Sequence, residues 1–342
     1  MRQKDIMISI DQKQSEYIRG IAIVFVVLGH ILGGFKVLDA NITNILGIGG
    51  VTMFLFLSGY GLYRSYQKNG LQFKAYWDKK IEKVFLPYAV ITVVYYLYMK
   101  LIGTAPGFPA LLSNILCVDY TRKIDGTMWY MSFLLLWYIA FFFVFYFKTP
   151  MVWRVGLLAL LGCAFYRYWL KDTFASCAWQ FSVNAFSFPI GVGFGYFADL
   201  VNRTQMFGKW KPHILRICWF VALGASVAVL VLTVFQILAI PYWVCGIAIF
   251  AVLYALFSLP KGELKVFKWL GANSFLIYLT EQKLIEIWMK LGIVETNIAI
   301  YLISYAAAIV AIVYLYRFGC FLWGRVQGYL EIRPSDGKNQ LK

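Results

Sequence analysis

Long apolar runs of about twenty residues alternate along this chain with shorter polar segments. A helix of about twenty apolar residues spans the hydrocarbon core of a bilayer, whereas transmembrane strands show short alternating segments. The pattern therefore predicts an all-α integral membrane protein with about ten transmembrane helices. We place these helices at residues 17–36, 47–66, 84–103, 128–147, 151–169, 180–199, 214–235, 240–258, 272–292 and 297–324.

The ninth range, 272–292, is the least regular of the ten. Its second half is interrupted by charged residues, namely Glu281, Lys283, Glu286 and Lys290. A solvated or interfacial helix end would explain them. The alternative is that an ionisable group inside the span serves the function of the protein.

Composition agrees with this class, because 61% of the residues are hydrophobic and only 14% are charged. Residues 1–16 are polar and lack the apolar core of a signal peptide, so they are expected to form a cytoplasmic N-terminal segment. Residues 17–324 form one transmembrane domain. Residues 325–342 are a short tail, too small for a soluble domain.

The net charge of +16 is carried largely by loops between the predicted spans. Basic residues exceed acidic ones in the loops after the second, sixth and eighth spans. Residues 104–127 are balanced, and residues 236–240 carry no charge. By the positive-inside rule both termini are cytoplasmic. The charge thus indicates orientation in a lipid bilayer, and no nucleic-acid partner is expected.

The six cysteines show no CxxC pair and no metal-ligand spacing, so no metal is expected. Most of them fall inside predicted spans, where cysteine is a small core residue. Cys117 and Cys177 lie in or near two loops on one predicted side. A disulfide between them is an open alternative.

Candidate chemistry begins with Arg19 and His30 in the first span. Eleven positions on an α-helix are about three whole turns and a rise of about 16 Å, so both side chains lie on one face. A buried histidine can be a general base or proton relay. Its alternative is a packing hydrogen bond to a neighbouring helix. For Arg19 the alternative is snorkelling at the cytoplasmic span end.

These residues resemble the acyltransferase 3 family of membrane enzymes. An arginine followed after ten residues by a histidine matches the family's first helix, and Glu16 stands where many members have aspartate. Four later segments also resemble family motifs in order: Gly50–Tyr60, with Ser58 and Tyr60; Lys79–Tyr88, with Lys79, Lys80 and Lys83; Trp129–Tyr130; and Gly271–Glu281. The resemblance covers nearly the whole chain and is of the stand-alone type, without a fused soluble domain.

Two positions depart from the family pattern. Glu281 occupies a position where many members have a second histidine, and Thr52 stands where many have aspartate. The lysines at 79, 80 and 83 replace arginines, which keeps the charge but loosens phosphate geometry.

The resemblance implies acyl transfer, usually of acetyl, from cytoplasmic acyl-CoA to a hydroxyl of a carbohydrate acceptor. The acceptor would be a polysaccharide or glycolipid, extracytoplasmic or membrane-embedded. The expected location is the inner membrane of a bacterium. Acyl-CoA is polyanionic, so the cytoplasmic basic residues are its expected contacts: Arg19, Arg64, Lys79, Lys80 and Lys83. The loop 64–83 can equally serve only to set topology.

His30 would act as general base or would accept the acyl group itself. Ser58 and Tyr60 can orient His30 or donate to the thioester oxygen, or they can simply join helices. Trp129 can be an acyl or sugar platform, or an interfacial anchor. The acceptor, the acyl chain length and the oligomeric state stay open.

A function from another class also fits an intramembrane histidine. In a proton-coupled transporter or flippase for a saccharide or anion, His30 and Glu281 would relay protons. Transporters often repeat broken helices in two halves. Only the sixth range combines a proline, Pro189, with clustered glycines, and no other range matches it.

Overall fold

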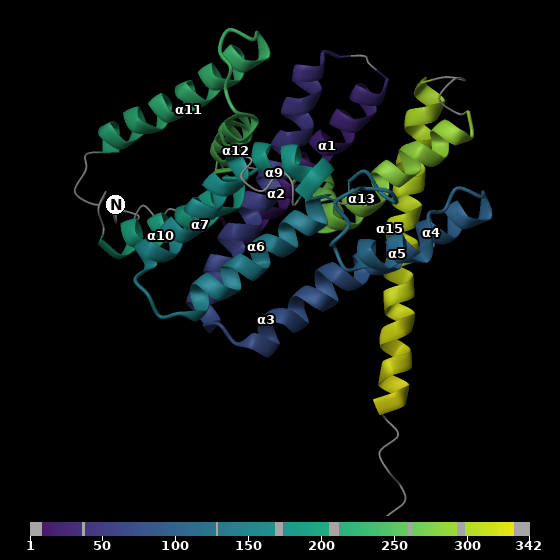
Figure 1. Ribbon diagram of the computed structural model, residues 1–342. Helices are drawn as coiled ribbons and strands as arrows, with labels where there is room; N and C mark the ends of the chain where they lie inside the picture. The colour runs from purple at the N-terminus through teal and green to yellow at the C-terminus, as the bar shows by residue number, and fades with distance from the viewer. Residues whose placement is uncertain are drawn as a thin grey trace, which may run out of the picture. The chain divides into compact units, whose positions relative to one another are not determined.

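A computed structural model describes residues 9–35, 38–127, 129–167, 174–204, 212–258, 262–292 and 298–331 (Figure 1). Regular structure in these residues is helical. The longer helices are α1 (Gln12–Gly34), α2 (Ala40–Asn69), α4 (Leu86–Leu101), α6 (Trp129–Tyr146), α7 (Met151–Tyr166), α10 (Ser187–Thr204), α11 (Pro212–Val234), α12 (Tyr242–Ser258), α13 (Lys265–Lys290) and α15 (Ile298–Glu331). Shorter ones are α3 (Phe73–Lys80), the π-helical turn Ile81–Phe85, α5 (Phe108–Ile115), the 3₁₀ turn Ala175–Cys177 and α9 (Ala178–Val183).

Each of the ten predicted ranges overlaps one of the longer helices. Five helical stretches are long and apolar enough to cross a membrane: Gln12–Gly34, Ala40–Asn69, Phe73–Leu101, Trp129–Tyr146 and Ala299–Trp323. Three shorter apolar stretches accompany them: Met151–Tyr166, Phe220–Val234 and Tyr242–Ser258. The all-helical fold and several apolar spans are thus observed. Ten membrane crossings and the side on which each terminus lies stay predictions.

The first two helices begin earlier than the hydrophobic pattern predicts. Asp11 caps α1 through its side chain, which accepts from the Gln14 N–H at 2.7 Å, and Gln14 returns a bond to the Asp11 N–H. Asp39 caps α2 by accepting from the Asn41 N–H. Such caps extend a helix into polar sequence, where hydrophobicity alone gives no signal.

The predicted loop between the second and third spans is largely helical. Only residues 70–72 separate α2 from α3, and α3 continues through the π-helical turn into α4. Gly70 ends α2 with φ of +67°, a conformation that glycine adopts without strain. The basic residues of this segment therefore lie on a helix rather than on an irregular loop.

The predicted sixth span, 180–199, is two helices instead of one. Residues 184–186 form a turn between α9 and α10. Pro189 is the third residue of α10, where its missing N–H has no intrahelical acceptor to lose. The break after α9 places one polar residue, Asn184, in a buried position at the turn between the two helices.

The chain forms two compact units, Met1–Gln282 and Lys283–Lys342. In the first unit α2 is the central helix, against which α1, α10 and α12 pack (Figure 1). Gly29 and Gly50 allow α1 and α2 to approach closely. A Cβ on Gly29 would lie 2.8 Å from the Gly47 backbone nitrogen, and a Cβ on Gly50 would lie 2.6 Å from the Ala22 carbonyl oxygen. In the second unit the Trp288 Nε1–H donates to Ser304 Oγ at 2.8 Å.

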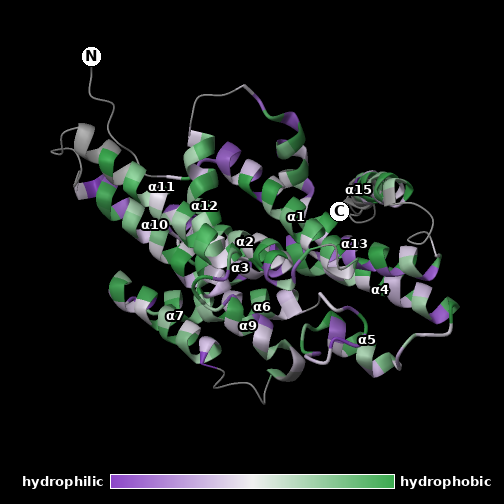
Figure 2. Ribbon diagram, turned by 90° about the horizontal axis from the view of Figure 1, so that it is seen from above, coloured by the Kyte–Doolittle hydropathy of each residue, from purple (hydrophilic) through white to green (hydrophobic). Residues whose placement is uncertain are grey.

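Large apolar side chains are exposed along several helices. In Figure 2 hydrophobic residues, in green, recur along these helices among less hydrophobic ones. Examples with more than half of the residue exposed are Val94, Leu97, Leu101, Leu160, Phe220 and Val221. So much exposed apolar surface is unfavourable in contact with water but favourable in contact with lipid. These faces are suited to a bilayer.

A Cys117–Cys177 disulfide is not formed, since both thiols are free. The Cys177 thiol instead donates to the Tyr120 carbonyl oxygen. Parts of the predicted N-terminal segment and C-terminal tail, residues 1–8 and 332–342, lie outside the described residues.

Candidate active site

Helix α13 approaches α1 so closely that their backbones are in contact. A Cβ on Gly20 would collide with the Phe267 carbonyl, and a Cβ on Gly271 would collide with the Glu16 carbonyl. Small residues at such a crossing let two membrane helices pack tightly. The contact sets the distance between the polar side chains that the two helices carry further along.

Those side chains include His30 of α1 and Glu281 of α13, which form a hydrogen bond. His30 Nδ1 lies 2.7 Å from Glu281 Oε1. The Glu281 side chain is fully buried, while 34% of the His30 side chain is exposed. Glu281 is therefore not at a solvated helix end. It is a buried partner for one nitrogen of an accessible imidazole.

This geometry assigns different roles to the two ring nitrogens of His30. An ionised carboxylate only accepts hydrogen bonds, so the proton of a neutral imidazole resides on Nδ1. Nε2 then carries the lone pair and can accept a proton or attack a carbonyl. A carboxylate on Nδ1 also stabilises the imidazolium that forms after proton transfer.

His30 opens into a cavity of about 400 Å³. Helices α1, α2, α6, α9 and α13 and the segment before α6 contribute its lining: Gly29, His30, Gly33, Gly34, Thr43, Asn44, Gly47, Ile48, Val51, Arg122, Gly126, Thr127, Trp129, Trp179, Gln180, Val183, Asn184, Tyr278 and Gln282. Below we call it the His30 cavity. Trp129, anticipated from the sequence, is one of its walls.

Arg122 brings a positive charge to the His30 cavity. It has φ of +56°, which is uncommon for a residue with a side chain. Its Nε donates to Ser176 Oγ at 3.3 Å, and its Nη1 donates to the Gln180 side-chain oxygen at 2.7 Å. The guanidinium is thus held in place by α9 and the 3₁₀ turn before it.

Asn184, another wall of the His30 cavity, is held by the second helix. Its Oδ1 accepts from the Thr52 hydroxyl at 3.3 Å, and its side-chain N–H donates to the Gln180 carbonyl. Thr52 is fully buried. Thr52, which stands where the family resemblance implies aspartate, therefore links α2 to the turn after α9.

Arg19 lies beside a second cavity of about 380 Å³, which we call the Arg19 cavity. Its lining is Ser15, Arg19, Phe54, Leu57, Ser58, Gly61, Leu62, Val84, Tyr130, Leu134, Tyr138, Ser274, Phe275 and Tyr278. The Arg19 Nε donates to the Ser15 carbonyl at 3.2 Å. Ser58 belongs to this cavity, alongside the tyrosines of α6, and is not in the lining of the His30 cavity.

Tyr278 is in the lining of both cavities. Its hydroxyl donates to the Thr127 carbonyl at 3.0 Å, and its ring lies 4.8 Å from that of Tyr130, centroid to centroid. Tyr278 is therefore a wall between the space beside Arg19 and the space beside His30.

Only some of the basic residues predicted to contact acyl-CoA lie close to one another in the structure. Lys79 and Lys80 line a small cavity that shares Leu62 with the Arg19 cavity. Lys80 Nζ lies over the Tyr76 ring, 4.4 Å from its centroid. Lys83 is exposed on the π-helical turn. Arg64 instead pairs with Asp199, with 2.6 Å between Nη1 and Oδ1.

Tyr60 and Glu16 form hydrogen bonds with residues near the start of the described chain. The Tyr60 hydroxyl accepts from the Ile10 N–H at 3.0 Å and donates to the Ile10 carbonyl. The Glu16 carboxylate accepts from the Gln12 side chain. Neither residue is part of the lining of the His30 or Arg19 cavity.

Sequence reasoning gave no role to several lining residues of the His30 cavity: Arg122, Trp179, Asn184, Tyr278 and Gln282. Tyr278 lies within a matched motif, three positions before Glu281, and that spacing places both on one helix face. Arg122 and Trp179 lie in or near short segments without a helical hydrophobic period, so the sequence pattern gives no signal for their place in the site.

The family model of the acyltransferase 3 acyltransferase domain matches residues 12–317. The chain belongs to this family. No curated protein and no solved structure matches it. Family membership and the apolar helices together make this chain a multi-pass membrane acyltransferase.

Proposed function

We propose that this acyltransferase moves an acetyl group from cytoplasmic acetyl-CoA to a hydroxyl of an extracytoplasmic or membrane-embedded carbohydrate. The observation that carries the proposal is the His30–Glu281 pair, because it faces a cavity whose wall Tyr278 also borders the Arg19 cavity. The acceptor is a polysaccharide or a glycolipid. The bilayer is the inner membrane of a bacterium, with both termini in the cytoplasm.

The donor side has the charge that a CoA ester requires. Arg19, Lys79 and Lys80 line two cavities that share Leu62, and the expected ligand carries several phosphates. Arginine binds phosphate through paired N–H donors, while lysine supplies a point charge. The Arg19 cavity is otherwise mainly apolar or aromatic, which suits the uncharged arm of the donor. Lys83, exposed nearby on the same helical segment, extends the basic surface.

The chemistry follows from the orientation of His30. Nε2 accepts the proton of the acceptor hydroxyl while the hydroxyl oxygen attacks the thioester carbonyl carbon. The carbon–sulfur bond then breaks, and the CoA thiolate leaves with the proton from the imidazolium. Glu281 stabilises the imidazolium between these steps. Arg122 stands in the same cavity as a cationic group that favours the negative charge on the carbonyl oxygen.

Direct transfer and transfer through an acyl-histidine use the same nitrogen. Both leave Nδ1–H on Glu281, so the pair supports either sequence of bond changes. We favour direct transfer, since the pair matches the base-and-orienter arrangement of hydroxyl-activating sites. Rapid acid quench of the enzyme with acetyl-CoA alone, followed by mass spectrometry of the peptide containing His30, tests this choice. A stoichiometric acetyl adduct on His30 contradicts direct transfer.

The proposal as a whole is tested with purified full-length protein in lipid vesicles. Release of CoA thiol from acetyl-CoA, with surface glycans of the source cells as acceptor, is measured together with the acetyl content of the glycan. Wild type is expected to release thiol and label glycan, and His30→Ala to do neither while remaining folded. Equal activity in His30→Ala contradicts the proposal.

A transporter is the second candidate, because the proton relay that it needs would also use His30 beside Glu281. A transporter moves a saccharide without consuming acetyl-CoA. Saccharide uptake into vesicles that is driven by a proton gradient and is independent of acetyl-CoA would favour this alternative over acyl transfer.

A further inference from the structure

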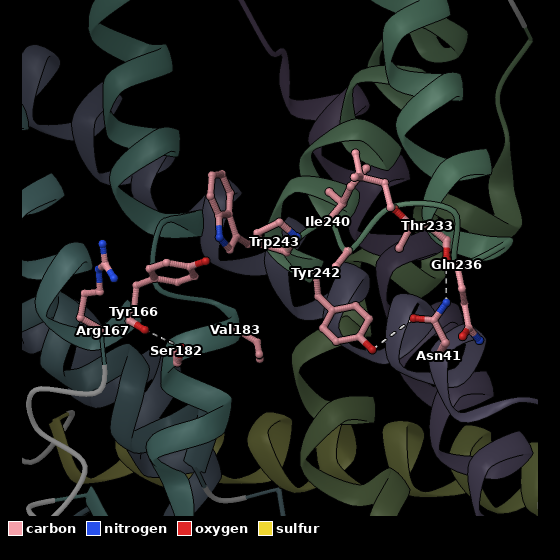
Figure 3. Close-up of a pocket in the computed structure, with 13 residues that line it drawn as sticks. Asn41, Tyr166, Arg167, Ser182, Val183, Thr233, Gln236, Ile240, Tyr242 and Trp243 are labelled. Atoms are coloured by element: carbon pink, nitrogen blue, oxygen red, sulfur yellow. Dashed lines mark hydrogen bonds between the residues drawn. The ribbon is translucent and has the colours of Figure 1, made fainter.

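A cavity larger than either of those described lies at one end of the helices. Its volume is about 900 Å³, toward the upper end of the range of about 300–1,000 Å³ that ligand sites occupy. Its walls come from the end of α7, the end of α9, the start of α2 and the segment that joins α11 to α12. In the view of Figure 3, Tyr166 and Arg167 lie on one side, Tyr242 and Asn41 on the other, and Val183 between them.

The lining combines aromatic rings with amide groups. Tyr166, Tyr242 and Trp243 supply rings, and Asn41 and Gln236 supply amides. An amide offers both donors and an acceptor, which matches neighbouring hydroxyls on a sugar ring, while an aromatic ring covers the apolar C–H face of that sugar. Lipid tails would not require these polar groups.

Arg167 gives the lining its charge preference. Its side chain is exposed, and the lining contains no aspartate, glutamate or lysine. Asp39 accepts from the Gln236 side chain at 3.4 Å on the opposite side, whereas the described lining beside Arg167 holds no carboxylate. The Arg167 side favours an anionic group on the ligand, because guanidinium binds carboxylate or phosphate through two parallel hydrogen bonds. The ligand that fits is therefore a saccharide that carries an acidic substituent.

The aromatic side of the lining contains an unused donor. The Trp243 Nε1–H is buried and has no hydrogen-bond partner among the described residues. Buried donors in native proteins are almost always paired, so an unpaired one beside a cavity is an uncommon feature of this wall. Trp243 itself is held by its ring, which packs against Phe186 at 5.0 Å between centroids.

Backbone strain marks the opposite side. Gln236 has φ of +56°, in the left-handed region that glycine and asparagine adopt more readily. Such conformations persist at ligand-binding sites, where the surroundings hold them. Nearby, the Asn41 side chain donates to the Thr233 carbonyl at 2.7 Å and accepts from the Tyr242 hydroxyl at 3.2 Å, which fixes both groups at the wall (Figure 3).

This large cavity adjoins the His30 cavity across α9. Val183 is in the lining of both. The residue before it, Ser182, faces the large cavity, and the residue after it, Asn184, faces the His30 cavity. Val183 therefore borders both the large cavity and the cavity that contains the imidazole.

We propose that the large cavity binds an acidic oligosaccharide, whose terminal or neighbouring sugar reaches over Val183 to present its hydroxyl to His30. The inference rests on the proposed function for its purpose, since it names where the acceptor lies and the chemical class of that acceptor. Its binding step involves no covalent change. Tyr166 and Arg167 are the positions to vary, because both are exposed at the end of α7 and their loss leaves the helix core intact.

The test measures binding of the purified full-length protein to immobilised oligosaccharides. The probes are neutral glucan and galactan chains and uronate-containing chains of equal length. Wild type is expected to retain the uronate chains more strongly than the neutral ones. Tyr166→Ala is expected to weaken retention about tenfold, equivalent to about 1.4 kcal/mol. Arg167→Gln is expected to remove the preference for uronate chains.

Matched controls are Trp153→Ala, an exposed aromatic residue near the other end of α7, and Lys148→Gln, an exposed cation before it. Both should bind like wild type. Failure of wild type to retain any of the probes overturns the inference, as does unchanged binding in Tyr166→Ala and Arg167→Gln. Equal retention of neutral and acidic chains by wild type overturns the acidic class.

Acetyl-CoA turnover separates this inference from the proposed function. His30→Ala is expected to bind oligosaccharide normally while transfer stops. Normal oligosaccharide binding in a wild-type protein that never consumes acetyl-CoA would overturn the proposed function and leave the saccharide site standing. Acetyl transfer by wild type, together with oligosaccharide binding that Tyr166→Ala and Arg167→Gln leave unchanged, would support the proposed function and overturn the saccharide site.

Discussion

His30 and Glu281 lie 2.7 Å apart although 251 positions separate them in the chain. The Glu281 carboxylate is fully buried, and His30 faces a cavity. At the position where the family resemblance implies a second histidine, this chain has an acid that is hydrogen-bonded to His30. In the proposed function the pair is a base with its orienting partner.

Glu281→Gln tests the role of the carboxylate. The amide oxygen can still accept from Nδ1, but it cannot stabilise an imidazolium, so kcat should fall by about two to four orders of magnitude with little change in the acetyl-CoA KM. Steady-state kinetics in vesicles measures both. The matched control is Glu263→Gln, which removes an exposed carboxylate just before α13 and should keep the wild-type kcat. A Glu281→Gln enzyme with wild-type kcat would remove Glu281 from the mechanism.

Arg19→Ala tests the donor side. Loss of a charge-assisted hydrogen bond of about 1.5–3 kcal/mol should weaken acetyl-CoA binding roughly ten- to a hundredfold. The kcat at saturating donor should change little. Calorimetric titration with acetyl-CoA measures the affinity. Lys68→Gln, which removes an exposed cation at the end of α2, is the control for net charge. Equal affinities for Arg19→Ala and wild type would place the CoA phosphates elsewhere.

Tyr278→Ala tests the wall between the Arg19 and His30 cavities. Removal of the ring should join the two spaces and admit water to the thioester, so acetyl-CoA hydrolysis without acceptor should rise relative to transfer. Tyr278→Phe keeps the ring and loses only the hydrogen bond to the Thr127 carbonyl. It should retain coupling and lose about 1 kcal/mol of stability. Similar hydrolysis in wild type and Tyr278→Ala would show that Tyr278 does not separate water from the donor.

Gly271→Ala tests whether the α1–α13 contact positions the pair. The added methyl group meets the Glu16 backbone, so the helices must separate, at a cost of about 1–3 kcal/mol. The melting temperature and kcat should both fall. Gly156→Ala on α7 is the control, because among the described residues nothing beyond the neighbouring backbone of α7 lies within 4 Å of its added Cβ. A Gly271→Ala protein as stable and active as Gly156→Ala would mean that the close crossing is dispensable.

The hydrophobic pattern alone predicts a helical membrane protein, because the apolar faces of these helices extend over whole spans. The same pattern misses where helices begin and break. Asp11 and Asp39 extend α1 and α2 by capping, and the turn at residues 184–186 divides a range that looks continuous. Caps and turns depend on side-chain hydrogen bonds that hydrophobicity does not register.

The order of motifs also identifies the family and the candidates Arg19 and His30, because their eleven-residue spacing fixes one helix face. Spacing says nothing of partners on other helices. The structure alone pairs Glu281 with His30, Tyr60 with Ile10 and Arg64 with Asp199. It likewise brings Arg122 and Trp179 to the His30 cavity from short segments that show no periodicity. A helix period determines which face a residue occupies, but the packing of helices far apart in the sequence decides what that face meets.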